Sequence, residues 1–277
     1  MKVAQALREA AARLAEVSET PRLDAEHLMT HALEVSRSEM LLRHGDAPAP
    51  PAFATLIERR AGGEPLAYVL GTAEFYGLAF EVMPDVLIPR RDSEVLVEAA
   101  LAAMPNASDV LDLGTGSGAL LLAVLQHLPE ASGTGIDASA AALAVATRNA
   151  KSLDLATRAR FVEADWTRAR WLENLAPPYD MVLANPPYVE DDGELAPSVR
   201  DHEPHSALFA GPQGLDDYHI LIPALPQLLG RDGIAFVEIG AKQAEAVSAI
   251  AEQASLSATV IRDIENRPRV LRLLCKT

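Results

Sequence analysis

Hydrophobic side chains recur with a helical period along the first 72 residues. One apolar face runs through Val3, Leu7, Ala10, Ala11 and Leu14, and a second through Ala25, Leu28, Met29, Ala32 and Leu33. Thr20-Pro21 is a typical start for the second helix, and Ser36 to Glu39 fits a capping box for a third. We therefore predict that residues 1–72 form a small all-α bundle of four or five helices, which is either a spacer or a docking module.

The hydrophobic period changes to two between Thr72 and Pro89. Phe75, Leu78, Phe80 and Val82 alternate with other residues around Gly77. This alternation predicts a β-hairpin, and we assign residues 73–90 to a linker.

After Asp92, strand-like apolar runs alternate with helical segments. Strands are expected near residues 108–113, 133–137, 159–164, 179–184, 233–239, 256–263 and 269–275, and helices near 117–128, 139–152, 216–229 and 241–254. Such alternation predicts an α/β domain over residues 91–277, built on a mostly parallel, doubly wound sheet of seven strands. Only Glu265 to Pro268 separates the last two strands, which is too short for a parallel crossover, so one closing strand must be antiparallel.

The charge balance argues against nucleic-acid binding by charge alone. The chain of 277 residues carries 39 acidic and 24 basic side chains, a formal charge of −15. Cys275 is the single cysteine, which excludes an internal disulfide framework and a multi-cysteine zinc site. Charges at Lys2, Arg8 and Glu9 leave no apolar signal segment, and no run approaches the ~18 apolar residues of a membrane span. We expect a cytoplasmic protein that contacts no membrane.

A glycine-rich turn follows the first strand of the α/β domain. Asp112 precedes Gly114-Thr115-Gly116-Ser117-Gly118, and the glycines let the backbone approach a ligand at the start of the next helix. Gly114-x-Gly116-x-x-Ala119 also satisfies the dinucleotide fingerprint, so a nicotinamide cofactor stays an alternative. Asp112, suited to a ligand ammonium, and an acid-lined pocket, suited to a sulfonium, favour S-adenosyl-L-methionine.

Two further strand ends carry candidate cofactor ligands. Asp137 lies 23 residues past Gly114, where a carboxylate can accept from both ribose hydroxyls, although it could instead cap the helix that follows. Asp165-Trp166 ends the next strand, so the indole could lie on an adenine face and the carboxylate could meet its exocyclic amine. The alternative for Trp166 is a core position.

Asn185-Pro186-Pro187-Tyr188 ends the apolar strand 179–184 and predicts a grip on a planar NH2 group. Two prolines cannot continue a strand ladder, so the Asn185 side-chain oxygen and the Pro186 carbonyl are exposed at the sheet edge. Those acceptors could hold both N–H bonds of an amide or amine while Tyr188 stacks on the planar group. An ordinary turn is the competing interpretation. Asp201 to His205 resembles metal-ligand spacing but has no supporting cluster, so we expect no metal.

These motifs, together with segments outside them, resemble the PrmC/HemK family of protein-glutamine methyltransferases over almost the whole chain. The flanking segments that carry the resemblance are residues 21–26 (PRLDAE), 63–71 (GEPLAYVLG), 87–90 (LIPR), and Glu203-Pro204 with Ala207-Leu208, Gly211 and Gly214-Leu215. Arg91 and His202 depart from the usual family residues.

The resemblance implies a class I S-adenosylmethionine-dependent fold and methylation of the glutamine side-chain nitrogen in the Gly-Gly-Gln motif of peptide chain release factors. It also implies that Gly114 to Gly118, Asp137, Trp166 and Asn185 contact the cofactor, that Asn185 to Tyr188 hold the glutamine, and that residues 1–72 help to hold the release factor.

Three alternatives differ in what they require of the chain. A DNA adenine methyltransferase would share both motifs but would need a basic duplex groove, and residues 1–75 carry 11 acids against 8 bases. A nicotinamide oxidoreductase leaves Asn185 to Tyr188 unexplained. A binding module without activity would not need both motifs intact.

Overall fold

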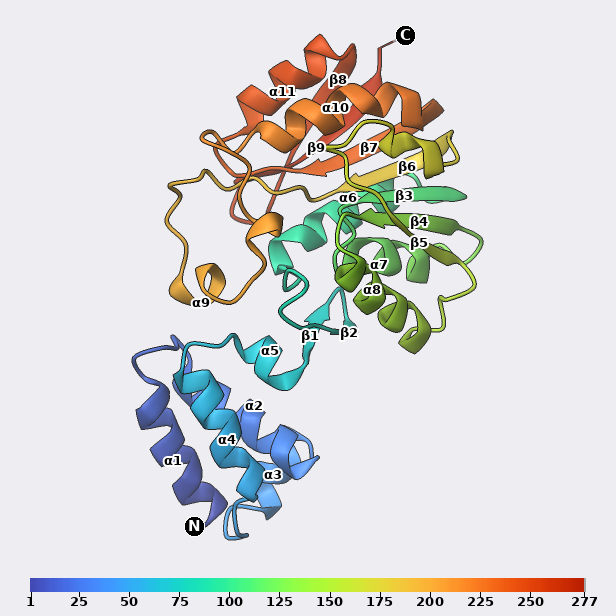
Figure 1. Cartoon of the computed structure of the whole chain (residues 1–277). Helices are drawn as coiled ribbons and strands as arrows, with labels where there is room; N and C mark the ends of the chain where they lie inside the picture. Colours follow the sequence, from blue (N-terminus) through green and yellow to red (C-terminus); the bar gives the residue numbers. More distant parts are fainter. Residues whose placement is uncertain (277) are drawn as a thin grey trace. The chain divides into compact units, whose positions relative to one another are not determined.

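The chain divides into two compact units, described by a computed structural model over residues 1–276 (Figure 1). The first unit comprises Met1–Thr72 together with Leu195–His202. The second comprises Ala73–Glu194 and the chain from Glu203 onward.

The first unit is helical, as predicted. Its helices are α1 (Val3–Leu14), α2 (Pro21–Leu33), α3 (Arg37–Arg43), α4 (Pro51–Ala61) and α5 (Leu66–Leu70), with the short α9 (Pro197–Arg200) from the later segment. The predicted cap at Ser36 forms, because its hydroxyl accepts a hydrogen bond from the Glu39 amide at 3.2 Å. A cluster of buried apolar side chains that includes Leu14, Leu28 and Met29 holds these helices together.

The buried face of α2 carries two carboxylates that the hydrophobic pattern does not reveal. Asp24 accepts a hydrogen bond from Arg60 Nε at 2.8 Å, and Glu26 accepts from Arg22 and Arg37, each at 2.6 Å. Both acids are nearly inaccessible to solvent, and the arginines supply the pairing that a buried carboxylate requires.

The linker is a two-stranded hairpin, β1 (Thr72–Phe75) and β2 (Leu78–Glu81). Tyr76 and Gly77 form its turn with φ of 50° and 73°, the left-handed conformation that tight hairpins require. Phe75 and Phe80 are buried and meet edge to face.

The second unit is built on a seven-stranded sheet in the order β5-β4-β3-β6-β7-β9-β8. The strands are β3 (Asp109–Leu113), β4 (Ser132–Asp137), β5 (Ala159–Glu163), β6 (Tyr179–Ala184), β7 (Leu229–Glu238), β8 (Leu256–Arg262) and β9 (Pro268–Cys275). Strand β9 runs antiparallel to both of its neighbours, β7 and β8, which confirms the predicted antiparallel closing strand.

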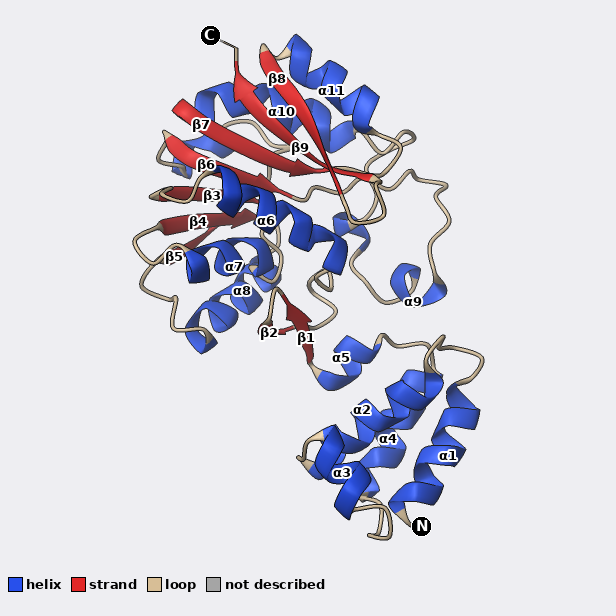
Figure 2. Ribbon diagram, turned by 180° about the vertical axis from the view of Figure 1, so that it is seen from behind, coloured by secondary structure: helices blue, strands red, loops and turns tan. Residues whose placement is uncertain are grey.

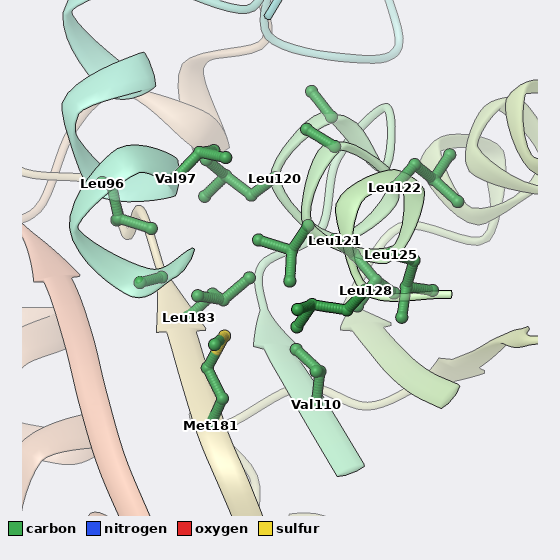
Figure 3. Packing of buried hydrophobic residues seen from close by; sticks show 14 of the residues in the cluster. Leu96, Val97, Val110, Leu120, Leu121, Leu122, Leu125, Leu128, Met181 and Leu183 are labelled. Carbon is green, nitrogen blue, oxygen red and sulfur yellow. The ribbon is translucent and has the colours of Figure 1, made fainter. Parts of the chain in front are cut away.

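Helices cover both faces of this sheet (Figure 2). They are α6 (Glu94–Ala103), α7 (Ala119–His127), α8 (Ala140–Ser152), α10 (Asp216–Leu228) and α11 (Ala244–Gln253). Val110, Met181 and Leu183 pack with leucines of α6 and α7 in one apolar layer (Figure 3). Leu111 and Val182, the alternate positions on the same strands, pack against α10 and α11.

Helix α6 is an element that the sequence pattern did not assign. Its run Val95-Leu96-Val97 is continuously apolar and gives no clear helical period. The short 3₁₀ turn η1 (Arg91–Ser93) precedes it, and two others, η2 (Trp171–Asn174) and η3 (His205–Ala207), lie in the later loops.

Candidate active site

The glycine-rich turn and the Asn-Pro-Pro-Tyr segment begin at the same level of the sheet. Strands β3 and β6 are paired with Leu113 opposite Ala184, so Gly114 and Asn185 leave adjacent strands side by side. Leu113 is also opposite Ile136, which brings Asp137 to the same edge. In parallel α/β sheets this carboxyl edge is where ligands bind.

The glycine-rich turn folds tightly over the end of β4. The amides of Gly114 and Thr115 both donate to the Ile136 carbonyl, at 3.0 and 2.8 Å. Gly114 has a φ of 76°, and a Cβ there would meet the Trp166 ring at 3.0 Å. Gly116 has a φ of 52°, and a Cβ there would meet no atom within 4 Å. The backbone at Gly116 is therefore bare toward open space.

That open space is a cavity of about 370 Å³ at the carboxyl edge. Gly114, Gly116, Asp137, Trp166 and Asn185 line it, with Pro187, the linker segment 84–87 and residues 204, 206 and 207. A smaller neighbouring cavity of about 60 Å³ adds Thr115 and Ser117 to the lining and also reaches Asn185. Neither lining includes Gly118, whose φ of 83° allows the turn to enter α7.

Asp137 ties the glycine-rich turn to β4. Its Oδ2 accepts from the Gly116 amide and its Oδ1 from the Ser139 amide, both at 2.9 Å. Ser139, rather than Asp137, is the N-cap of α8, since its hydroxyl accepts from the Ala142 amide. Burial raises the pKa of Asp137 despite these bonds. Each carboxylate oxygen keeps a second lone pair for a hydroxyl donor.

Trp166 lines the cavity, whereas its neighbour Asp165 does not. The indole is half-buried against Gly114, and its Nε1 donates to Asp217 Oδ1 at 2.6 Å. Asp165 instead accepts from the Thr167 amide and hydroxyl, at 2.9 and 2.6 Å, and pairs with Arg168. The carboxylate of Asp165 is therefore paired with its chain neighbours outside both cavity linings, and its predicted contact with an adenine stays a prediction.

Asp112 lies beneath the glycine-rich turn and not in either cavity lining. It is fully buried, its Oδ2 accepts from the Thr115 hydroxyl at 2.7 Å, and its Oδ1 has no partner among residues 1–276. Burial raises the pKa of Asp112 to about 7. In this structure the partner of Asp112 is therefore the Thr115 hydroxyl of the glycine-rich turn, and the predicted contact with a ligand ammonium stays a prediction.

The Asn-Pro-Pro-Tyr segment presents two oxygen acceptors at the end of β6. Asn185 Nδ2 lies 3.4 Å from the Ser93 hydroxyl, while Asn185 Oδ1 and the Pro186 carbonyl accept no hydrogen bond from residues 1–276. Pro186 and Pro187 are both buried, and Pro187 lines the main cavity, whereas Pro186 is in neither cavity lining.

Tyr188 lies outside both cavity linings, unlike the stacking position we expected. Its hydroxyl is 3.4 Å from Glu238 Oε1, and its carbonyl accepts from Gln243 Nε2 at 3.0 Å. Burial, reinforced by Glu238, raises the pKa of Tyr188 to about 12. Tyr188 is therefore anchored to β7 and the loop after it.

Four polar residues that we did not predict as site residues contact the residues or segments at the carboxyl edge of the sheet. Ser93, Asp217 and Glu238 contact Asn185, Trp166 and Tyr188, respectively. Glu203 is buried, pairs with Arg90 and accepts from the Ile88 amide at 3.1 Å, which joins the linker to the segment after Asn185. Arg90 and Glu203 already belonged to the segments that carry the family resemblance, but only the fold brings them together.

Two other features of the described residues bear on function. Within residues 1–276, no group of three His, Cys, Asp or Glu side chains is arranged to hold a metal ion. None of the helices in that part of the chain has the length and apolar character needed to span a membrane.

Family models match residues in both units of the chain. Residues 5–71 match the family model of the PrmC N-terminal domain, and residues 91–200 match that of the methyltransferase small domain. A release factor glutamine methyltransferase of Caulobacter vibrioides is 39% identical over 91% of this chain and 88% of its own length. One of Cereibacter sphaeroides is 40% identical over 98% of both chains.

Solved structures resemble the fold of the second unit. A methyltransferase from Pyrococcus furiosus superposes with a TM-score of 0.55 at 14% identity, over 73% of this chain and 91% of that one. A ribosomal protein L11 methylase from Lactobacillus delbrueckii subsp. bulgaricus gives a TM-score of 0.50 at 21% identity, over 71% and 84%. These likenesses confirm the predicted methyltransferase fold.

Proposed function

Because this chain belongs to the family of release factor glutamine methyltransferases, we propose that it methylates the side-chain amide nitrogen of the glutamine in the Gly-Gly-Gln motif of peptide chain release factors. The methyl donor is S-adenosyl-L-methionine. Release factors act in translation, so we place the reaction in the cytoplasm.

The residues at the carboxyl edge fit the donor. Gly116 leaves the bare backbone that a closely held ligand needs, Asp137 keeps lone pairs for ribose hydroxyls, and Trp166 offers an aromatic face for adenine. The main cavity lining contains Asp85 and Asp137 and no lysine or arginine, which suits a cationic sulfonium. When bound, the donor supplies an electrophilic methyl group. Thr115 and Ser117 shape the turn, and Asp112 supports it from below.

The oxygen acceptors after β6 would orient the amide nitrogen of glutamine, which is a weak nucleophile. An amide nitrogen reacts poorly because its lone pair is delocalised into the carbonyl. Asn185 Oδ1 and the Pro186 carbonyl would each accept one N–H bond of the glutamine, which fixes the orientation of the nitrogen. As positive charge develops on that nitrogen, the same two oxygens stabilise it. Pro186 and Pro187 contribute rigidity and no competing donor.

The observation that carries this proposal is the Asn185 side chain, whose Oδ1 accepts no hydrogen bond from residues 1–276 and which lines the same cavity as the bare Gly116 backbone. A basic DNA duplex groove would instead be needed for adenine methylation. Incubation with radiolabelled S-adenosylmethionine and either a release factor or duplex DNA separates the two substrates. We expect label on the release factor, whereas label confined to DNA would overturn the proposal.

We propose that the two units divide the work. Residues 1–72 would dock the release factor, residues 73–90 would act as the linker, and residues 91–277 would carry out methyl transfer. Leu42, which is 83% exposed on α3, and Leu41 and Leu23, which are also exposed, give the helical unit apolar surface for a protein partner. The net charge of −15 favours a partner with a basic surface.

A further inference from the structure

We propose that Ser93 and Glu238 are positioning residues that hold the Asn185 amide with Oδ1, rather than Nδ2, toward the substrate nitrogen. This inference rests on the proposed function of Asn185. Only Oδ1 can accept a substrate N–H, whereas Nδ2 would oppose one donor with another. The orientation of this one amide therefore decides whether the site can hold the glutamine.

Ser93 touches Asn185 but cannot select its orientation alone. The serine ends η1, is 3% exposed, and places its Oγ 3.4 Å from Asn185 Nδ2. A hydroxyl both donates and accepts, so the same oxygen could accept from Nδ2 or donate to a reversed Oδ1. The distance is at the long end of the hydrogen-bond range.

Glu238 can make that selection because an ionised carboxylate only accepts. It ends β7, is 1% exposed, and its carboxylate lies beside Ser93 and Tyr188. Its Oε2 has no partner of ordinary hydrogen-bond geometry among residues 1–276. A carboxylate that attracts the Ser93 proton leaves Ser93 Oγ as an acceptor toward Asn185. Nδ2 must then face Ser93, and Oδ1 faces the cavity.

Protonation of Glu238 removes the selection. A protonated carboxyl can donate to Ser93, which frees the serine proton to turn toward Asn185 and stabilise the reversed amide. The groups around Glu238 set the pH at which it is protonated. Burial raises the pKa of Glu238 to about 7; Asp92 adds to the rise, whereas Ser93, Arg269 and Tyr188 lower it. Tyr218, from α10, also faces this residue and donates to its backbone carbonyl. Arg269 itself pairs with Asp92 at 2.8 Å.

This arrangement predicts that turnover rises with pH through neutrality. Glu238 is protonated below its pKa, so the productive amide orientation is favoured above it. The substrate amide does not titrate in this range, so an inflection near pH 7 would report the enzyme. Asp112 also has a pKa of about 7, and the profile of Glu238→Gln separates the two carboxyls. Glu238→Gln has no charge to lose, so its turnover should not change through neutrality and should lie about threefold to tenfold below the wild type at high pH.

A variant cycle tests whether Ser93 acts through Asn185. We expect Ser93→Ala to lower kcat about tenfold, with KM values for both substrates within about twofold of the wild type. In an Asn185→Ala background the same substitution should cause no further loss. Ser257→Ala, which removes an exposed hydroxyl on β8, is the control and should keep full activity.

Two results would overturn the inference. Equal losses from Ser93→Ala in the wild-type and Asn185→Ala backgrounds would show that Ser93 does not act through Asn185. An inflection that persists in Glu238→Gln would show that Glu238 does not control it. If Glu238→Gln fails to fold, the Ser93 cycle decides alone. Wild-type label transfer to the release factor is measured first, so failure of the proposed function is distinguished from failure of this inference.

Discussion

The substitution Gly116→Ala, with Gly77→Ala as its control, tests the cofactor site. Gly116 and Gly77 both have positive φ, 52° and 73°, and at both a Cβ would meet nothing within 4 Å. They differ in place, because Gly116 lines the main cavity and Gly77 is in the turn of the linker hairpin. Gly116→Ala and Gly77→Ala therefore share backbone strain but differ in their effect on a ligand.

The shared strain can be estimated. An L-residue in the left-handed region costs about 1–2 kcal/mol. For a domain of ~200 residues, each kcal/mol lowers Tm by about 2–4 °C, so both variants should lose roughly 2–8 °C. Only Gly116→Ala places its methyl group where the backbone faces the cavity. We expect its dissociation constant for S-adenosylmethionine to rise at least about tenfold, which corresponds to ~1.4 kcal/mol.

Titration calorimetry with S-adenosylmethionine, together with thermal unfolding, measures both quantities. Gly77→Ala should bind the cofactor with wild-type affinity and unfold at a reduced temperature. Wild-type affinity in Gly116→Ala, at a similarly reduced Tm, would show that the bare backbone at Gly116 has no part in cofactor binding.

Three further substitutions test the substrate acceptor Asn185, the buried carboxyl Asp112 and the exposed Leu42. Asn185→Ala should lower turnover by about 10²-fold or more while leaving cofactor affinity near normal, because it removes one acceptor for the substrate nitrogen; unchanged turnover would exclude Asn185 from the mechanism. Burial raises the pKa of Asp112 to about 7, so the free energy of unfolding falls as pH rises from ~4 to ~7. In denaturant unfolding, Asp112→Asn should gain on the order of 1–4 kcal/mol of unfolding free energy relative to the wild type between about pH 5 and pH 8. A difference that does not depend on pH would contradict this assignment. Leu42→Glu, on the exposed surface of α3, should raise the KM for the release factor about fivefold to tenfold without changing kcat, and an unchanged KM would remove this leucine from the docking surface.

Strand ends were the most predictable part of the site. Each motif combined an apolar run with a strong break, such as the glycines after Leu113 or the prolines after Ala184, and parallel strands bring such breaks to one edge. The antiparallel closing strand followed from loop length alone. These features depend on local chemistry and simple topology, which a single sequence records.

The supporting contacts could not be predicted in the same way. Ser93 and Glu238 are 145 residues apart, and only the fold brings Glu238 beside Ser93 and Ser93 beside Asn185. The position of Asp165 after a strand predicts a cofactor ligand, but its carboxylate bonds to Thr167 and lies outside both cavity linings. Asp24 and Glu26 interrupt an apolar face, and their arginine partners lie on other helices or outside the periodic run. Side-chain pairing across the fold decides each of these cases.

Mass spectrometry of a release factor shows directly whether the protein methylates the glutamine of the Gly-Gly-Gln motif. Unmethylated release factor is incubated with the enzyme and S-adenosylmethionine, digested with trypsin, and its Gly-Gly-Gln peptide is fragmented. We expect one added methyl group on the glutamine side chain, absent when Asn185→Ala replaces the wild type over the same time. A peptide that stays unmodified with active, cofactor-bound enzyme, or a methyl group on any other residue, would contradict it.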